Sequence, residues 1–259
     1  MIYRRVAARL RAQDWLAITI EVAIVIVGVF IGTQVSNWNE DRLARREADR
    51  MLVEVKPVFG SFIRSIDTAV EYFRVTGAYA KIATAGWNGD PSVSDEQFVI
   101  AAYQAGQIYI TGLSGSGLGM LIGSDRLRNI TDPEIRDKLT TFIIMDIPAY
   151  EAPLATDYRK HLRQVIPEEI QDAIRVRCGT RRFADHYFYV ELTPKCDLLI
   201  ADAEFHNVAA ELRRRPDIRG ELRGHGAIVA SYVRDAKDVK TLAEQLLTRL
   251  DRLSIGKSR

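Results

Sequence analysis

The chain begins with a long apolar run whose pattern differs from that of the residues after it. From Trp15 to Val35 the sequence is WLAITIEVAIVIVGVFIGTQV, in which Glu21 is the only ionisable side chain. As a helix this run would be about 31 Å long, which matches the hydrocarbon core of a bilayer. The pattern predicts a transmembrane helix over residues 15–36.

A cleavable signal peptide is the alternative interpretation, because residues 1–14 form a basic leader with four arginines. The apolar run is longer than the hydrophobic region of most signal peptides, and the following VSNWNEDR lacks an A-x-A-like cleavage site. We therefore favour a retained anchor. Trp15 and Trp38 bracket it, as expected for interfacial side chains at the two surfaces of a bilayer.

Beyond the anchor, apolar residues recur at helical spacing. Residues 37–85 contain no Gly/Pro/Ser-rich linker, so we expect the transmembrane helix to continue as a stalk and then as the first helix of a bundle. Pro57 removes a backbone donor and predicts a break or a kink. Residues 86–259 would form the remainder of the soluble helical domain.

This remainder reads as a series of shorter helices. Ser94 and either Thr131 or Asp132 are candidate N-caps, while Pro148 and Pro153 should bend or divide the helix that follows the second cap. The glycine-rich TGLSGSGLG predicts a tight connection. We expect helices over residues 95–109, 118–122, 133–166, 167–176, 198–215 and 226–253.

Two cysteines, Cys178 and Cys196, flank a segment with alternating aromatic and aliphatic residues, which predicts a small β-hairpin. A disulfide between them would contribute about 3 kcal/mol in an oxidising compartment. The alternative is two unrelated buried thiols, which behave as small hydrophobic residues. We favour the disulfide, and with it a cytoplasmic N-terminus and a periplasmic domain. The positive-inside rule alone is nearly balanced, because four arginines precede the span and four follow it.

Composition narrows the function classes. The 36 Lys and Arg against 34 Asp and Glu leave a net charge of +2, which argues against nucleic-acid binding. A hydrophobic content of 47% with 27% charged residues excludes a disordered chain and a polytopic membrane protein. The predicted fold class is mostly α: an N-terminal transmembrane helix that continues into an extracytoplasmic helical bundle with a small β-hairpin.

Motifs for catalysis or cofactor binding are weak. The four histidines form no HExxH or similar metal-ligand pattern, so we expect no metal and no other cofactor. The glycine-rich segment matches neither a phosphate loop nor a nucleophile elbow. The basic cluster Arg213-Arg214-Arg215 could face anionic lipid or a partner, but interleaved acids favour an ordinary solvated face.

One stripe of the predicted span combines small residues with the single acid. At 100° per residue, Ala17, Gly28 and Gly32 lie within about 40° of Glu21 on the helix surface. Small residues let helix backbones approach closely, and a carboxylate inside hydrocarbon normally faces protein or water. The stripe predicts a contact face for another transmembrane helix. The alternative is chance composition, with Glu21 reaching toward the near interface.

Two stretches carry a resemblance to a known family. The first is EVAIVIVGVFIGTQVSNWNEDR, with an acid, a glycine-containing apolar run, a glutamine and a closing N-W-N-E; the second, residues 101–142, ends in an E-[IL]-R-x-K-L helix. Together they resemble a bacterial family of uncharacterised single-pass membrane proteins, the domain of unknown function 6090 family. The resemblance implies a membrane-anchored helical domain and supplies no activity or catalytic residue.

The predicted function is that of a structural or interaction subunit in a bacterial inner membrane. Its transmembrane helix and its periplasmic helical domain would dock on a partner complex, which is either a second copy or a larger assembly. A ligand-sensing or ligand-binding module is the alternative, because membrane-tethered helical bundles suit sensing outside the cytoplasm. A membrane-tethered enzyme is a third interpretation.

Overall fold

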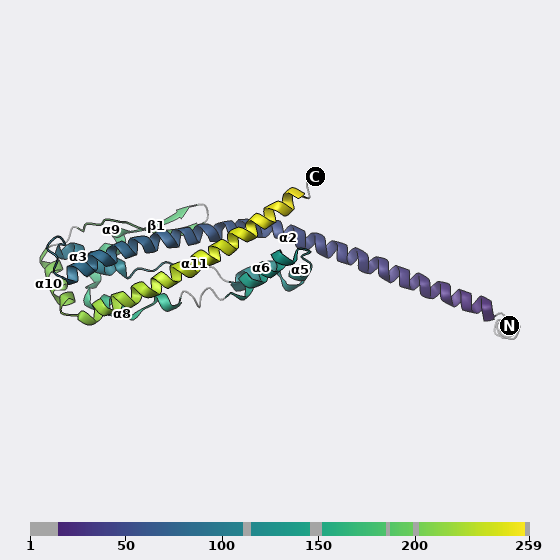
Figure 1. Ribbon diagram of the computed structural model, residues 1–259, viewed down its shortest axis with the longest axis horizontal. Coiled ribbons are helices and arrows are strands. Elements are labelled where there is room, and N and C mark those ends of the chain that lie inside the picture. Colours follow the sequence, from purple (N-terminus) through teal and green to yellow (C-terminus); the bar gives the residue numbers. More distant parts are fainter. Residues whose placement is uncertain (1–14, 111–114, 146–151, 185–186, 199–201, 257–259) are drawn as a thin grey trace.

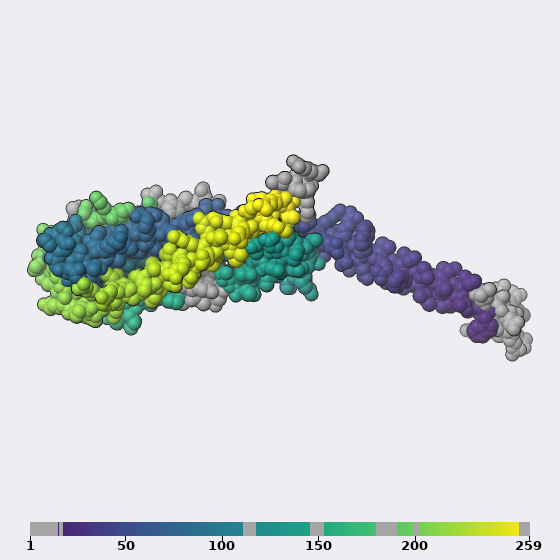
Figure 2. Space-filling view, viewed as in Figure 1, coloured from purple at the N-terminus to yellow at the C-terminus, as the bar shows by residue number. Residues whose placement is uncertain are grey.

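The computed structural model describes residues 15–110, 115–145, 152–184, 187–198 and 202–256. This part of the chain is mostly helical and is built on two long helices, α2 (Trp15–Trp87) of 73 residues and α11 (Pro216–Gly256) of 41 residues. The two helices pack side by side in opposite directions (Figure 1). The N-terminal part of α2 projects from the body as a single helix (Figure 2).

Two ion pairs show that α2 and α11 are antiparallel. Lys56 Nζ lies 2.9 Å from an Asp251 carboxylate oxygen, and Lys240 Nζ lies 2.5 Å from that of Asp67. Moving forward along α2 therefore moves backward along α11. Consequently α11 ends beside the point where α2 leaves the body, which we call the proximal end, and it begins at the opposite, distal end.

Shorter elements cover both ends of this pair (Figure 1). At the proximal end lie α4 (Gly115–Ile122), α5 (Ser124–Arg128) and α6 (Pro133–Ile144). Toward the distal end lie α3 (Asp95–Ala105), the short 3-10 helix η1 (Ala152–Leu154), α8 (Asp157–Val165), α9 (Glu168–Cys178) and α10 (Asp202–Arg213). The strands β1 (Gly179–Ala184) and β2 (Tyr187–Leu192) pair antiparallel, with Gly179 opposite Leu192.

The buried residues form two hydrophobic cores along α2. In the proximal core, α2 residues from Ala48 to Ile66 pack against α4, α6 and the C-terminal half of α11. In the distal core, α2 residues from Ala69 to Trp87 pack against α3, α8, α9, α10 and the first half of α11. One helix therefore joins both cores to the projecting segment.

Local sequence signals explain several helix boundaries. Ser94 caps α3 with a complete capping box, in which its hydroxyl accepts from the Gln97 amide and the Gln97 side chain accepts from the Ser94 amide. Asp132 caps α6, with Pro133 at the first helical position, where its missing N–H is not needed. Gly86 permits the close packing of α2 on α3, because a Cβ there would lie 2.3 Å from the Phe98 ring.

At two boundaries packing outweighs local propensity. Of the break or kink predicted at Pro57, the break does not occur, since α2 is continuous through this residue and Val55 and Phe59, on either side, are buried in the proximal core. The last helix begins at Pro216 and not at Gly226. Its glycines disfavour a helix, but the burial of Ile218 and Leu222 stabilises this first part.

In the middle of the chain, one prediction agrees with the structure and one needs a new boundary. The helix predicted over 133–166 is divided, as expected from its prolines: α6 ends at Ile144 and α8 begins at Asp157, with Pro153 in η1 and Pro148 outside the described residues. The glycine-rich connection becomes helical from Gly115. Gly119 lets α4 approach α6, because a Cβ there would lie 3.2 Å from Ile143.

Candidate functional site

The apolar segment of α2 is the first candidate site. Within the described residues, one helix is long and apolar enough to cross a membrane, and its most apolar 18-residue window has a mean hydropathy of 2.2 with no buried residue. Ile24 and Phe30 are 66% and 61% exposed. A continuous apolar surface of this size marks a membrane or protein contact.

The predicted contact residues lie on this exposed segment. Glu21, Gly28 and Gly32 are exposed, and a Cβ added at either glycine would meet no atom within 4 Å. Ala17 lies in α2, but its side chain is outside the described residues. No other described element of this chain fills the space over the two glycines.

The two tryptophans at the ends of the predicted span are also exposed. Trp15 and Trp38 are 68% and 64% exposed. The Arg42 guanidinium lies 5.7 Å from the Trp38 ring centre. This stacking places a cation and an aromatic ring together one turn beyond the apolar run, as in an interfacial belt. The basic leader, residues 1–14, lies outside the described residues.

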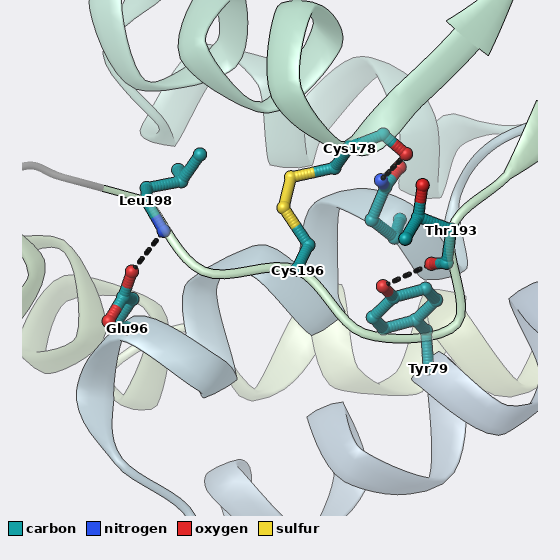
Figure 3. Close-up of a disulfide and its surroundings, with 7 residues drawn as sticks. Tyr79, Glu96, Cys178, Thr193, Cys196 and Leu198 are labelled. Carbon is teal, nitrogen blue, oxygen red and sulfur yellow. Dashed lines mark hydrogen bonds between the residues drawn. A yellow bond between two sulfur atoms is a disulfide. The ribbon is translucent and has the colours of Figure 1, made fainter.

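A disulfide joins the end of α9 to the segment before α10 (Figure 3). The Cα atoms of Cys178 and Cys196 are 5.4 Å apart, within the normal range for such a bond. The Tyr79 hydroxyl donates to the Thr193 carbonyl at 2.6 Å, and the Leu198 amide donates to a Glu96 carboxylate oxygen at 2.6 Å. The crosslinked segment is therefore tied to both α2 and α3.

Sequence reasoning missed a pocket between α2, α3, α8 and α9, with a volume of about 730 Å³. We call it the arginine pocket, because Arg159, Arg163 and Arg175 line it together with Tyr103 and Gln104. Among the described residues, no carboxylate lines it. The sequence contains no local pattern for this pocket, because these side chains come from three helices that only the fold brings together.

The three arginines differ in their surroundings. Arg159 is half-buried and donates to the Gly106 carbonyl. Burial, together with the charge of Arg163, lowers the pKa of Arg159 to about 10. Arg163 is exposed and lies 5.6 Å from the Tyr103 ring centre. Arg175 pairs with Asp172 and donates to the Tyr103 hydroxyl at 3.2 Å.

A second pocket of about 420 Å³ lies between α2 and α11. It is mainly apolar, and His225 lines it with only 2% exposure. The His225 Nδ1 lies 2.9 Å from the Thr156 hydroxyl. Burial, reinforced by the charge of Arg159, lowers the pKa of His225 to about 4, so this ring is neutral at pH 7.

The other histidines and the basic cluster make separate contacts. His161 and His206 pair with Glu221 and Asp95, and His186 lies outside the described residues. Among the described residues, no three His, Cys, Asp or Glu side chains form a group that could hold a metal ion. Each arginine of the cluster pairs with an acid of the chain itself: Arg213 with Asp95, Arg214 with Glu211, and Arg215 with Asp217.

No family model, curated protein or solved structure matches this chain. The likeness to the domain of unknown function 6090 family therefore stays a prediction.

Proposed function

We propose that this chain is a single-pass interaction subunit of a bacterial inner membrane, related to the domain of unknown function 6090 family. Its transmembrane helix and its periplasmic helical bundle would both dock on a partner complex. The observation that carries the proposal is the projecting segment of α2, an apolar surface that the described part of the chain leaves uncovered. Lipid covers most of such a surface, and a partner helix covers the rest.

The stripe around Glu21 supports a partner helix over lipid alone. A carboxylate facing hydrocarbon is costly, whereas one that faces another helix can be hydrogen-bonded or paired. Gly28 and Gly32 lie on the same stripe and leave open space above the backbone. Close approach of a second helix at the glycines brings its side chains within reach of Glu21.

Assembly of variants in mild detergent tests this face. Gly28→Ile and Gly32→Ile should each weaken association by about 1 kcal/mol or more, since membrane helices associate through packing. Val27→Leu and Val29→Leu add bulk on other faces and serve as matched controls. Native gels and co-purification measure the assembled fraction. If the glycine variants assemble as well as the valine controls, the contact face is wrong.

The cysteine pair supports a cytoplasmic N-terminus. A bond between Cys178 and Cys196 persists in the oxidising periplasm and is rare in the cytoplasm. Alkaline phosphatase fused to the C-terminus should therefore be active in a bacterial host. An inactive fusion, together with an active cytoplasmic reporter fused at the same position, would show that the orientation is the opposite one.

A ligand-binding module is the second candidate function, and the arginine pocket favours it. The volume of about 730 Å³ lies within the range of pockets that enclose small molecules. This function is compatible with the first, because the pocket and the stripe lie on different segments of α2.

A further inference from the structure

We propose that the arginine pocket binds a small soluble oxyanion, a molecule that carries a carboxylate or phosphate group. The pocket lies among α2, α3, α8 and α9, away from the transmembrane face, so this inference goes beyond docking on a partner. It rests on the charge of the lining, on the burial of one arginine and on the donors that surround it.

The positive charge of two of the lining arginines is not paired with an acidic side chain in the described part of the chain. Of the three arginines, Arg175 is paired with Asp172, whereas no ion pair joins Arg159 or Arg163 to a described acid. Arg159 and Arg163 are four residues apart on α8, so their like charges share one helix face and repel each other. A bound anion would remove this repulsion.

Burial makes the position of Arg159 costly without an anion. Partial burial of a guanidinium without a carboxylate removes water from the group and destabilises its charged form. Its hydrogen bond to the Gly106 carbonyl uses only part of a group that has five N–H donors. Arginine presents these donors in a planar fork that fits carboxylate and phosphate oxygens.

Neutral groups add further recognition. The Tyr103 hydroxyl accepts from Arg175, which leaves its own proton available for an anion. Gln104 is 2% exposed, and its amide nitrogen donates to the Cys178 carbonyl at 3.4 Å, so the lining is tied to the disulfide. The volume of about 730 Å³ accommodates a molecule of several carbon atoms as well as an inorganic ion.

The position of the pocket argues for a soluble ligand over a lipid headgroup. Tyr72, which lines the pocket from α2, is 37 residues beyond Val35, the last residue of the apolar run. Along a helix this separation is about 55 Å. A headgroup in the membrane that holds the span does not reach so far.

Calorimetric titration of the full chain in a neutral detergent tests the proposal. The probes are inorganic phosphate and succinate, each added at constant ionic strength set by chloride. We expect saturable binding of at least one probe, and the probe that binds identifies the oxyanion group. Arg163→Gln should weaken this binding roughly tenfold, since it removes a charge-assisted hydrogen bond.

Controls separate a specific site from general attraction. Arg163 is exposed, so its replacement should preserve the fold, which far-ultraviolet circular dichroism checks. Arg223→Gln removes the same charge from an exposed position on α11 and should leave affinity within about twofold. Three results would overturn the proposal: no saturable binding of either probe, equal weakening by both variants, or binding that occurs only to vesicles of anionic phospholipid.

Discussion

The two halves of α2 have the same backbone but opposite surroundings. Residues 18–43 are exposed along their whole length, and as far as Val35 they are apolar on nearly every face. From Ala48 onward, buried residues recur every three or four positions and form one stripe, while the other faces are mostly polar. The first half presents its side chains to an environment outside the described chain, whereas the second half packs against other helices of the chain.

This difference shows which part of the helix depends on internal packing. A stripe of buried side chains gains its stability from α4, α6, α3 and α11, so changes there alter folding. An apolar surface on all faces has no internal partner, so changes there alter association or membrane insertion. Substitutions of one residue type in the two halves therefore have different consequences.

Phenylalanine offers the sharpest contrast. Phe59 is 2% exposed, and its ring centre lies 4.9 Å from that of Phe142. Phe59→Ala should lower the free energy of unfolding by about 3–5 kcal/mol, because it leaves a cavity in the proximal core. Chemical unfolding of the full chain in detergent, followed by near-ultraviolet circular dichroism, measures this loss.

The matched variant is Phe30→Ala, on the exposed half of the same helix, where the side chain is 61% exposed. We expect it to leave the unfolding of the bundle unchanged within about 0.5 kcal/mol. Equal losses for both variants would contradict the division of α2 into two halves.

The disulfide should give the next largest effect, confined to the distal end of the bundle. Reduction of the bond between Cys178 and Cys196, 18 residues apart, should lower the free energy of unfolding by about 3 kcal/mol, because the unfolded chain gains freedom. Urea unfolding with and without dithiothreitol measures the change.

The double variant Cys178→Ala, Cys196→Ala provides the control and should not respond to dithiothreitol. Assembly through the projecting segment of α2 should be the same in both redox states, because the bond lies in the bundle. A wild-type midpoint that dithiothreitol leaves unmoved would show that the crosslink does not stabilise this fold.

Buried His225 makes the bundle sensitive to acid to a smaller extent. Its pKa falls from the usual 6.5 to about 4 on folding, so the unfolded chain binds the proton more tightly. Its contribution to stability is complete above pH 6.5 and decreases by about 1.4 kcal/mol per pH unit as the pH falls toward 4. Thermal unfolding between pH 7.5 and pH 5 should follow this trend.

Two glutamine variants check the assignment to this ring. His225→Gln should flatten the pH dependence in this range. His206→Gln, whose side chain is 73% exposed in the wild type, should preserve it. If both variants keep the same slope, another group is responsible.

The parts that sequence predicts best are those governed by local rules. A long apolar run and a regular spacing of three and four indicate α2, and short-range hydrogen bonds make Ser94 and Asp132 recognisable caps. The start of α11 was not predicted, because the contacts that bury Ile218 are made with residues distant in the sequence. The low helix propensity of Gly220 and Gly224 disfavours a helix in this region.

The arginine pocket illustrates a stronger limit. Arg159 and Arg163 on α8 read as an ordinary charged helix face, and Arg175 on α9 pairs with Asp172 one turn away. Only the packing of these helices beside Tyr103 on α3 turns separate surface charges into one concave site. Sequence therefore indicates the span and its small-residue stripe, whereas the pocket needs the tertiary structure.

The continuity of α2 also sets the distance between the projecting segment and the distal end of the bundle. From Trp38 to Trp87 the helix includes about 74 Å of helical rise at 1.5 Å per residue, and it is continuous through Pro57. The distal end, with α3 and α10, therefore lies at a set distance along α2 from the projecting apolar segment. Removing seven residues from the exposed stretch before Ala48 would shorten that distance by about 10 Å and would nearly preserve the rotation of the bundle about the helix axis.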